Sequence, residues 1–282
     1  MTKALVLGGG GTVGIAWETG VLSGLREAGV DVTGADLIVG TSAGSVVGAQ
    51  LALGLPLEMM LATQLALSDP AQEQAITFDL SRFATVAQLL TQAPDVTDEL
   101  LRQLGRIALE SPTMPEADYL ERFALLRLPW PARRLLVTAV EAEQGQFQVW
   151  DSAADAPLQA AVASSCAVPG LFPPVTIGGR RYMDGGMRSS TNADLARGHE
   201  AVLVITPIRP QAAGLGAAGR RLDQQVADLR AAGSRVAVIE PDEADWRELG
   251  VNLMDTSRRA EAAQVGQRHG RQAAGLIRDI WG

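Results

Sequence analysis

Apolar runs alternate with helix-like stretches along the first fifty residues of the chain. Residues 3–7 form a short apolar run that ends in glycines, and residues 15–28 have the spacing of a helix that ends at Gly29. Residues 36–39 form a second apolar run, which leads through a tight turn into another apolar helix. This order of strand, helix, strand and helix predicts a parallel sheet with helices packed on its faces.

Similar patterns return in the second half of the chain. Gly178 and Gly179 lie between two short runs, and such a pair favours a primed turn, so residues 174–183 are expected to form a β-hairpin. Thr191 or Asn192 is expected to cap a helix that reaches Arg197. Further strands are predicted at residues 134–140, 146–150, 201–206 and 235–240, and further helices at residues 157–166, 217–232 and 256–281.

Residues 57–128 carry helical patterns and several prolines but few strand signals. Leucines at helical spacing predict a helix within residues 96–110. This insertion is expected to cover the sheet, and a wall or lid over an acyl pocket is the functional alternative. The apolar residues 46–67 are long enough to cross a bilayer, but Gly54 and Pro56 interrupt them, so two separate helices are predicted there.

Composition narrows the class of protein. With 282 residues, 47% hydrophobic and 20% charged, the chain is expected to form a single domain, 1–282, with a helical insertion at about 57–128 and a closing helix at about 256–281. The net charge of -8 argues against a nucleic-acid partner and against strong adhesion to anionic membranes. No secretory signal pattern or transmembrane segment is expected, which predicts a cytoplasmic location.

The cysteine and histidine content bears on disulfides and metals. A lone Cys166 cannot form an internal disulfide. The chain has only two histidines, His199 and His269, so a zinc site of the usual kind is not expected. No metal and no other cofactor is predicted.

The glycine loop after the first apolar run has two interpretations. Gly9, Gly11 and Gly14 match the G-x-G-x-x-G pattern of dinucleotide-binding loops. That pattern also requires an acidic residue at the end of the second strand, where this chain has Gly40 and Ser42 instead. The other interpretation is a row of backbone N–H donors beside Ser42, because parallel strands place both loops at the same sheet edge.

Ser42 lies in the sequence Gly40-Thr41-Ser42-Ala43-Gly44. In a Gly-x-Ser-x-Gly motif a sharp strand-to-helix turn makes the serine hydroxyl protrude, and the flanking Gly40 and Gly44 let strand and helix approach each other. The N–H groups at the start of the helix then face the hydroxyl and can stabilise an oxyanion. Ser42 is therefore the candidate nucleophile.

A serine nucleophile needs a base. The order Ser42, Asp184, His199 would suit a triad, but too few strands precede the elbow for an α/β-hydrolase, and His199 precedes a predicted strand instead of following one. His269 lies within a helical pattern. Asp184 is the remaining candidate, because the predicted hairpin delivers it and two glycines, Gly185 and Gly186, follow it and permit close approach.

Four segments together resemble the successive blocks of the patatin-like phospholipase family of bacteria: residues 9–14, 40–44, 163–175 and 184–186. The resemblance implies a three-layer α/β/α fold with a mainly parallel central sheet. It also implies a Ser–Asp dyad that hydrolyses lipid esters without metal or histidine. Ser42 would be the nucleophile and Asp184 the base, with an oxyanion hole formed by Gly9, Gly10 and Gly11 and by Ala43 at the helix start. Val13 departs from the family pattern, which has arginine or lysine there.

The expected function is therefore hydrolysis of lipid carboxylic esters through an acyl-enzyme, as a phospholipase A or another lipid acyl hydrolase. The expected partner is a lipid or ester substrate, which is compatible with transient contact with a membrane surface. The alternative is a regulatory or lipid-binding module with little hydrolysis, which the departure at Val13 favours. Ser164, Ser165, Arg188 and Asn192 are interpreted as structural residues.

Overall fold

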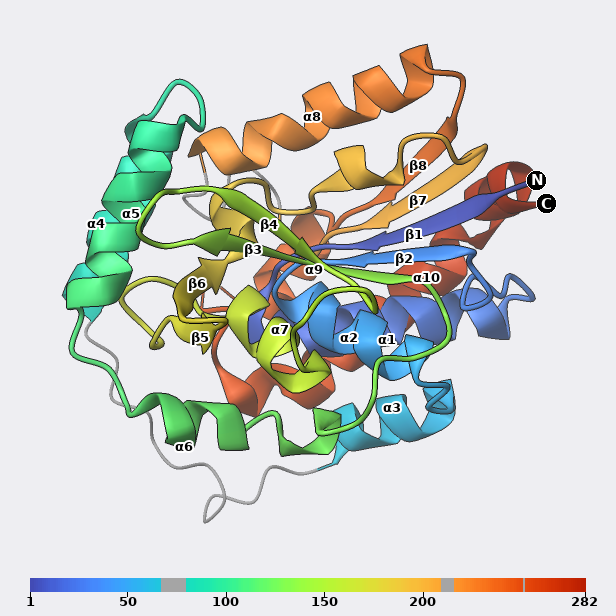
Figure 1. Ribbon diagram of the computed structural model, residues 1–282. Coiled ribbons are helices and arrows are strands. Elements are labelled where there is room, and N and C mark those ends of the chain that lie inside the picture. The colour runs from blue at the N-terminus through green and yellow to red at the C-terminus, as the bar shows by residue number, and fades with distance from the viewer. Residues whose placement is uncertain (67–79, 209–215, 251) are drawn as a thin grey trace.

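The computed structural model describes residues 1–66, 80–208, 216–250 and 252–282, and its centre is an eight-stranded sheet (Figure 1). The strands follow the order β5-β6-β3-β2-β1-β7-β8, and β4 also pairs with β3. The strands are β1 (Lys3–Leu7), β2 (Leu37–Gly40), β3 (Leu135–Glu141), β4 (Phe147–Trp150), β5 (Val175–Ile177), β6 (Arg180–Asp184), β7 (Ala201–Ile205) and β8 (Arg235–Ile239).

Helices cover both faces of the sheet, and the run β3-β2-β1-β7-β8 is parallel, which confirms the expected three-layer α/β/α fold. The α-helices are α1 (Gly11–Glu27), α2 (Ala43–Ala52), α3 (Leu57–Leu65), α4 (Leu80–Gln92), α5 (Asp98–Glu110), α6 (Glu116–Glu121), α7 (Leu158–Ser165), α8 (Gly216–Ala231), α9 (Glu243–Leu249) and α10 (Arg259–Trp281). Short 3-10 helices are η1 (Ala124–Leu126), η2 (Gly185–Met187), η3 (Ala193–Ala196) and η4 (Thr256–Arg258).

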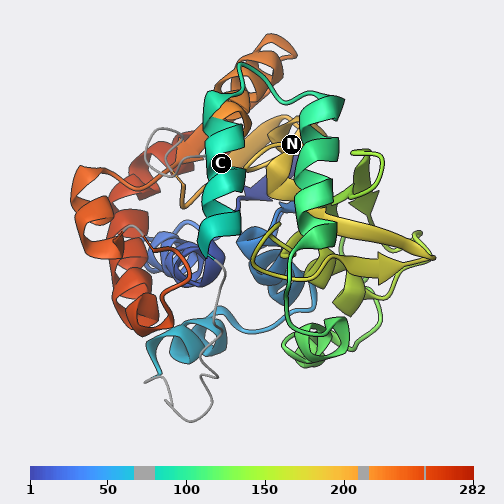
Figure 2. The same ribbon diagram turned by 90° about the vertical axis from the view of Figure 1, so that its left-hand side faces the viewer.

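Side chains of β1 alternate between two cores. Leu5 and Leu7 pack into the core shared with α1, α2, α7 and α10, and Ala4 and Val6 pack into the core shared with η3 and α8. The alternation follows from the period of two in a strand, and burial on both faces explains why the sequence is apolar throughout. Helices α4 and α5 stand side by side at the β5-β6 end of the molecule (Figure 2), where they form a third core with residues of β3 and β6.

Strands β2 and β6 meet end to end along one edge of β3. Gly40 of β2 pairs with Val137 in parallel, and Asp184 of β6 pairs with Ala139 in antiparallel fashion. Strand β4 pairs with both Val137 and Ala139, so it occupies the opposite edge of β3. Strands β2 and β6 run toward each other along this edge of β3, so both must leave the sheet where they meet. They do so on either side of Thr138.

The first and last helices pack backbone against backbone. A β-carbon at Gly20 or Gly24 of α1 would lie 2.1 Å from a carbonyl oxygen of α10. A β-carbon at Gly266 or Gly270 of α10 would lie 2.2 Å from a carbonyl oxygen of α1. These four residues, which we call the glycine seam, bring the helices closer than any side chain permits, so α10 is built into the core beside α1.

Several expectations are corrected by the structure. Helix α1 begins at Gly11, inside the glycine loop, and the predicted helix before Arg197 is the short η3. Asn192 occupies the N-cap position of η3, but its side chain makes no cap hydrogen bond because it is used elsewhere. The sequence also suggests a loop at residues 211–219, which overlaps the predicted helix at 217–232: residues 216–219 belong to α8, and residues 211–215 lie outside the described residues.

The described part of the insertion at residues 57–128 contains α3, α4, α5, α6 and η1, joined by irregular segments and without a strand, and residues 67–79 lie outside the described residues. The predicted break in the apolar stretch is confirmed, since Gly54 and Pro56 separate α2 from α3. Among the helices of the described residues, none combines the length and apolarity that a membrane span requires.

Candidate active site

Ser42 lies at the turn between β2 and α2 in a strained backbone conformation. Its φ of 52° and ψ of −119° place a non-glycine residue in the left-handed region, which costs on the order of 1–3 kcal/mol. A β-carbon at Gly40 would lie 2.5 Å from the Cα of Ser45, and one at Gly44 would lie 2.2 Å from the carbonyl oxygen of Leu7. The motif glycines are thus required by the approach of helix and strand, as the sequence predicts.

Asp184 ends β6 and lies beside Ser42. Asp184 is 2% exposed, its carboxylate accepts a hydrogen bond from the N–H of Gly186 at 2.7 Å, and it interacts with the Ser42 side chain. Burial raises the pKa of Asp184 to about 7, while the hydrogen bonds from Ser42 and Gly186 act in the opposite direction. A carboxylate with this pKa is a much better proton acceptor near neutral pH than an ordinary aspartate.

The two glycines after Asp184 are also sterically required. A β-carbon at Gly185 would lie 2.4 Å from the Oγ1 of Thr138, and one at Gly186 would lie 2.9 Å from Oδ1 of Asp184 itself. The predicted close approach of this segment is confirmed.

The glycine loop runs alongside Ser42, but its donors differ from those expected. The N–H of Gly9 donates to the carbonyl oxygen of Ser190 at 2.8 Å, so this donor is engaged within the protein in this conformation, and its role in an oxyanion hole stays a prediction. A β-carbon added at Gly9 would lie 3.4 Å from the β-carbon of Ser42, which is van der Waals contact, so the loop passes directly beside the serine. Among the described residues, no hydrogen bond uses the N–H groups of Gly10, Gly11 or Ala43.

Val13, the departure from the family pattern, is fully buried in the core beneath the loop. Its N–H donates to the carbonyl oxygen of Leu253 at 3.0 Å, which ties the start of α1 to the segment before α10. At this position, Val13 therefore contributes an apolar contact through its side chain and an anchor to Leu253 through its backbone N–H.

The peptide units of Ser42 are held by neighbouring side chains, among them Ser165, which is expected from the sequence to be structural. The N–H of Ser42 donates to Oγ of Ser165 at 2.9 Å, and the carbonyl oxygen of Ser42 accepts from Oγ of Ser45 at 2.7 Å and from Sγ of Cys166 at 3.3 Å. Burial, followed by the nearby charge of Asp184, raises the pKa of the Cys166 thiol, so it stays protonated and able to donate. These bonds hold the strained turn in place.

The only sequence signal for Ser165 and Cys166 is their position within the matching segment 163–175. Their partner, Ser42, lies more than 120 residues earlier in the chain, and no local pattern identifies it.

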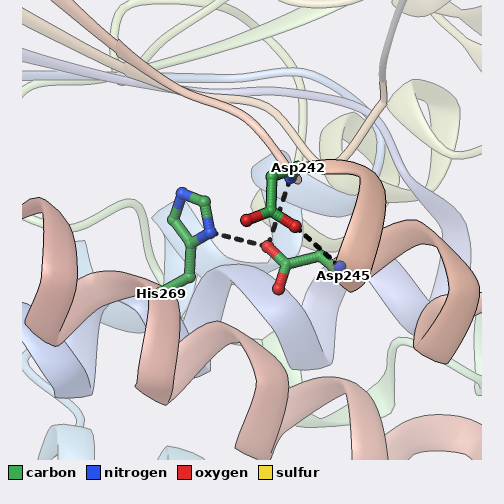
Figure 3. A group of neighbouring side chains, drawn as sticks. All are labelled: Asp242, Asp245 and His269. Atoms are coloured by element: carbon green, nitrogen blue, oxygen red, sulfur yellow. Dashed lines mark hydrogen bonds and ion pairs between the residues drawn. The ribbon is translucent and has the colours of Figure 1, made fainter.

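Neither histidine contacts the dyad in the part of the chain that the structure describes. His199 lies after η3, with Nδ1 3.0 Å from the carbonyl oxygen of Ala196. His269 lies in α10, with Nδ1 2.6 Å from Oδ2 of Asp245 (Figure 3). In the part of the chain that the structure describes, Asp184 is thus the carboxylate that interacts with the Ser42 side chain, and neither histidine does.

Asp242, Asp245 and His269 also form a group whose potential metal-binding atoms lie within 4.8 Å of one another (Figure 3). Contacts of α9 account for this arrangement. Oδ1 of Asp242 accepts the N–H groups of Ala244 and Asp245 at 2.8 Å, and Oδ2 of Asp245 accepts the N–H of Asp242 at 3.4 Å, which together form a capping box. The expectation that the protein needs no cofactor stays a prediction.

Comparison with known proteins adds a family to this geometry. The model of a family described as patatin-like phospholipase matches residues 5–197. Uncharacterized NTE family proteins of Mycobacterium tuberculosis and Mycobacterium bovis are 30% identical over 186 residues, which is 65% of this chain and 42% of theirs. The match therefore spans less than half the length of these curated relatives.

Two solved structures are similar to this one. VipD from Legionella pneumophila has a TM-score of 0.48 and 14% identity, with 98% of this chain and 67% of that chain covered. The type III effector protein ExoU has a TM-score of 0.41 and 18% identity, with 97% of this chain and 53% of that chain covered.

Proposed function

The chain belongs to the patatin-like phospholipase family, and we propose from this that it is a serine hydrolase of lipid carboxylic esters. The observation that carries the proposal is the pair formed by Ser42 on its strained turn and Asp184, a buried acid with a pKa of about 7. A hydroxyl held against such a base has the arrangement of an activated nucleophile.

The proposed reaction begins with attack of Ser42 Oγ on the ester carbonyl carbon, while the carboxylate of Asp184 takes the hydroxyl proton. The N–H groups of Gly10, Gly11 and Ala43 stabilise the oxyanion that develops, because no hydrogen bond among the described residues engages them. Asp184 then returns its proton to the leaving alcohol. Water, deprotonated by the same carboxylate, attacks the acyl-enzyme, and Asp184 returns that proton to Ser42 Oγ as the carboxylic acid leaves.

The substrate class is proposed as lipid esters, with phospholipase A activity or another lipid acyl hydrolysis as the specific reaction. A cytoplasmic location is likewise proposed. The net charge of -8 favours substrates reached through transient contact with a membrane surface over strong electrostatic adhesion.

Separate replacement of the two dyad residues tests the mechanism. We expect Ser42→Ala and Asp184→Ala each to lose nearly all hydrolysis of a p-nitrophenyl ester, because each removes one of the two groups that handle the transferred proton. His199→Ala is the matched control, and it is expected to keep its turnover because His199 contacts neither group in the described residues. Wild-type activity in either dyad variant would contradict the mechanism.

The alternative function, a lipid-binding module with little hydrolysis, predicts a different labelling result. A fluorophosphonate reacts covalently only with an activated serine, so the proposed enzyme is expected to be labelled at Ser42. A folded wild-type protein that resists the reagent would favour the binding module.

A further inference from the structure

Asn192 lies where the two strands that carry the dyad meet. The Nδ2 atom of Asn192 is 3.0 Å from Oγ1 of Thr41, the residue before Ser42, and 3.3 Å from the carbonyl oxygen of Gly185, the residue after Asp184. It also lies 3.2 Å from Oγ1 of Thr138, which separates the two strand ends on β3. One amide group thus contacts the chain on both sides of the junction.

The amide of Asn192 is fixed in direction by its surroundings. Its Oδ1 accepts from Arg188 at 2.7 Å, and its Nδ2 also donates to the carbonyl oxygen of Ser189 at 2.9 Å. Arg188 is itself held by Asp194 and by the ring of Phe147, 4.0 Å away. Because one end of the amide binds a cation, the N–H groups must point toward the junction.

The backbone of Asn192 has a positive φ, as that of Ser42 does, although its ψ of 41° places it in the αL region and that of Ser42 is −119°. The φ of Asn192 is 50°, and among the described residues only Ser42 shares a positive φ without being glycine. Asn192 is completely buried. Strain of this kind persists where the surrounding structure over-determines a residue, and it clusters at functional sites.

We infer that Asn192 is a positioning residue, which holds the turn of Ser42 and the turn of Asp184 at the separation that the proposed reaction needs. This inference rests on the proposed function. The role differs from that of a helix cap, because the side chain of Asn192 binds the two turns and not the start of η3. The residue acts through Thr41 and Gly185 and does not touch the reacting atoms.

The inference predicts a change in turnover for each active site. In Asn192→Ala the two turns lose their common donor, and a misplacement of the reacting groups by about 1 Å costs on the order of a hundredfold. We therefore expect kcat, normalised to the sites that a fluorophosphonate labels, to fall by roughly 10- to 100-fold with KM near the wild-type value.

A second readout separates positioning from simple destabilisation. The hydrogen bond from Ser42 lowers the pKa of Asp184, so its loss is expected to move the acid limb of the kcat/KM profile from near pH 7 to higher pH. Among the described residues, Tyr119 of α6 and Cys166 after α7 are the ionisable groups whose pKa values are raised by the charge of Asp184. Burial raises the pKa of both, so they stay neutral and do not produce this limb.

Gln225→Ala provides the matched control. Gln225 of α8 accepts from Oγ of Ser189 at 3.1 Å and from the N–H of Ala193 at 3.2 Å, so it belongs to the same buried network without contacting either turn of the dyad. We expect Gln225→Ala to lower thermal stability but to keep the wild-type kcat per labelled site and the wild-type acid limb.

Thr41→Val serves as a second test if Asn192→Ala does not fold. It removes the acceptor on the Ser42 side, together with the hydrogen bonds of Thr41 Oγ1 to Thr138 and Thr191, and leaves Asn192 and its contact with Gly185 in place, so a smaller loss in the same direction is expected. Wild-type turnover and an unmoved limb in Asn192→Ala, or in Thr41→Val if only that variant folds, would overturn the inference. Activity in Ser42→Ala would instead overturn the proposed function, so the two failures are distinguishable.

Discussion

At the scale of single residues, the site buries the carboxyl group of Asp184 where its charged form is unfavourable. Asp184 is buried, and its pKa of about 7 lies well above the value of about 3.9 for an aspartate in an unfolded chain. The folded protein therefore holds a proton on Asp184 between these two pH values that the unfolded chain has released. Ionisation of Asp184, which the proposed reaction needs, must lower stability.

Asp184→Asn is expected to reveal this cost. Because the folded-state pKa is raised, the wild-type protein loses stability as the pH rises from about 4 to about 7 and no further above that. The uncharged asparagine escapes this loss, so the variant should become more stable than wild type by up to a few kcal/mol at pH 8. Urea unfolding at pH 4.5, 6 and 8 measures the difference.

The informative result of that experiment is the pH dependence. A difference in unfolding free energy that stays constant from pH 4.5 to pH 8 would contradict the raised pKa. Ser42→Ala, measured in parallel, controls for the loss of the hydrogen bond between the two residues.

The sequence predicts Ser42 and Asp184 as candidate catalytic residues because each lies beside glycines in a short motif. In these motifs the glycines let the backbone turn sharply or approach its neighbours closely. The sequence does not predict Gly9 as an occupied donor, since the acceptor, Ser190, lies on a loop 181 positions later. Asn192 was hidden for the same reason, because its partners Thr41 and Thr138 are 151 and 54 residues away. Hydrogen bonds between distant segments leave no periodic trace in the chain.

At the scale of elements, the glycine seam decides how α10 binds to α1. The sequence predicts α10 as an alanine-rich closing helix, but its alanines do not reveal where it packs. The glycine seam determines where α10 packs, because glycines four residues apart on each helix leave no side chains between the backbones of α1 and α10. Helix α10 offers a test of this contact, since a β-carbon added at Gly275 of the same helix would have no atom within 4 Å.

Gly270→Ala and Gly275→Ala are expected to act in opposite directions. The β-carbon at Gly270 meets the carbonyl oxygen of Val21 at 2.2 Å, so the helices must separate at a cost of about 1–3 kcal/mol. At Gly275 the added methyl is unopposed, and the better helix propensity of alanine should stabilise the protein by about 0.5–1 kcal/mol. Thermal or urea unfolding compares the two, and equal effects would contradict the seam.

At the scale of the whole molecule, the family match ends before the sheet does. It covers residues 5–197, whereas β7 and β8 complete the parallel part of the sheet and α10 covers α1. The alternation of strands and helices predicted a parallel sheet with helices packed on its faces, and the family resemblance implied the three-layer fold. The end-to-end meeting of β2 and β6 could not be predicted, because it depends on which edge of β3 each strand occupies.

Removal of residues 259–282 is expected to abolish cooperative unfolding. Without α10, Trp17 and Val21 of α1 lose the helix that buries them. The core also loses the buried side chains that α10 itself contributes, Val265, Ile277 and Trp281. The shortened protein should bind 8-anilinonaphthalene sulfonate and show no sharp thermal transition by circular dichroism, in contrast to the full chain. A soluble fragment that unfolds cooperatively and is labelled by a fluorophosphonate would contradict this expectation.

The glycine seam also shapes how the protein can change by mutation. Every replacement of Gly20, Gly24, Gly266 or Gly270 adds at least a β-carbon where a carbonyl oxygen already lies within 2.2 Å. A saturation screen scored only by ester hydrolysis would therefore find these four positions nearly as intolerant as Ser42, although they take no part in the chemistry. Counting fluorophosphonate-labelled molecules per total protein would separate the two groups, since seam variants would lower the number of competent molecules and leave the turnover of each one intact.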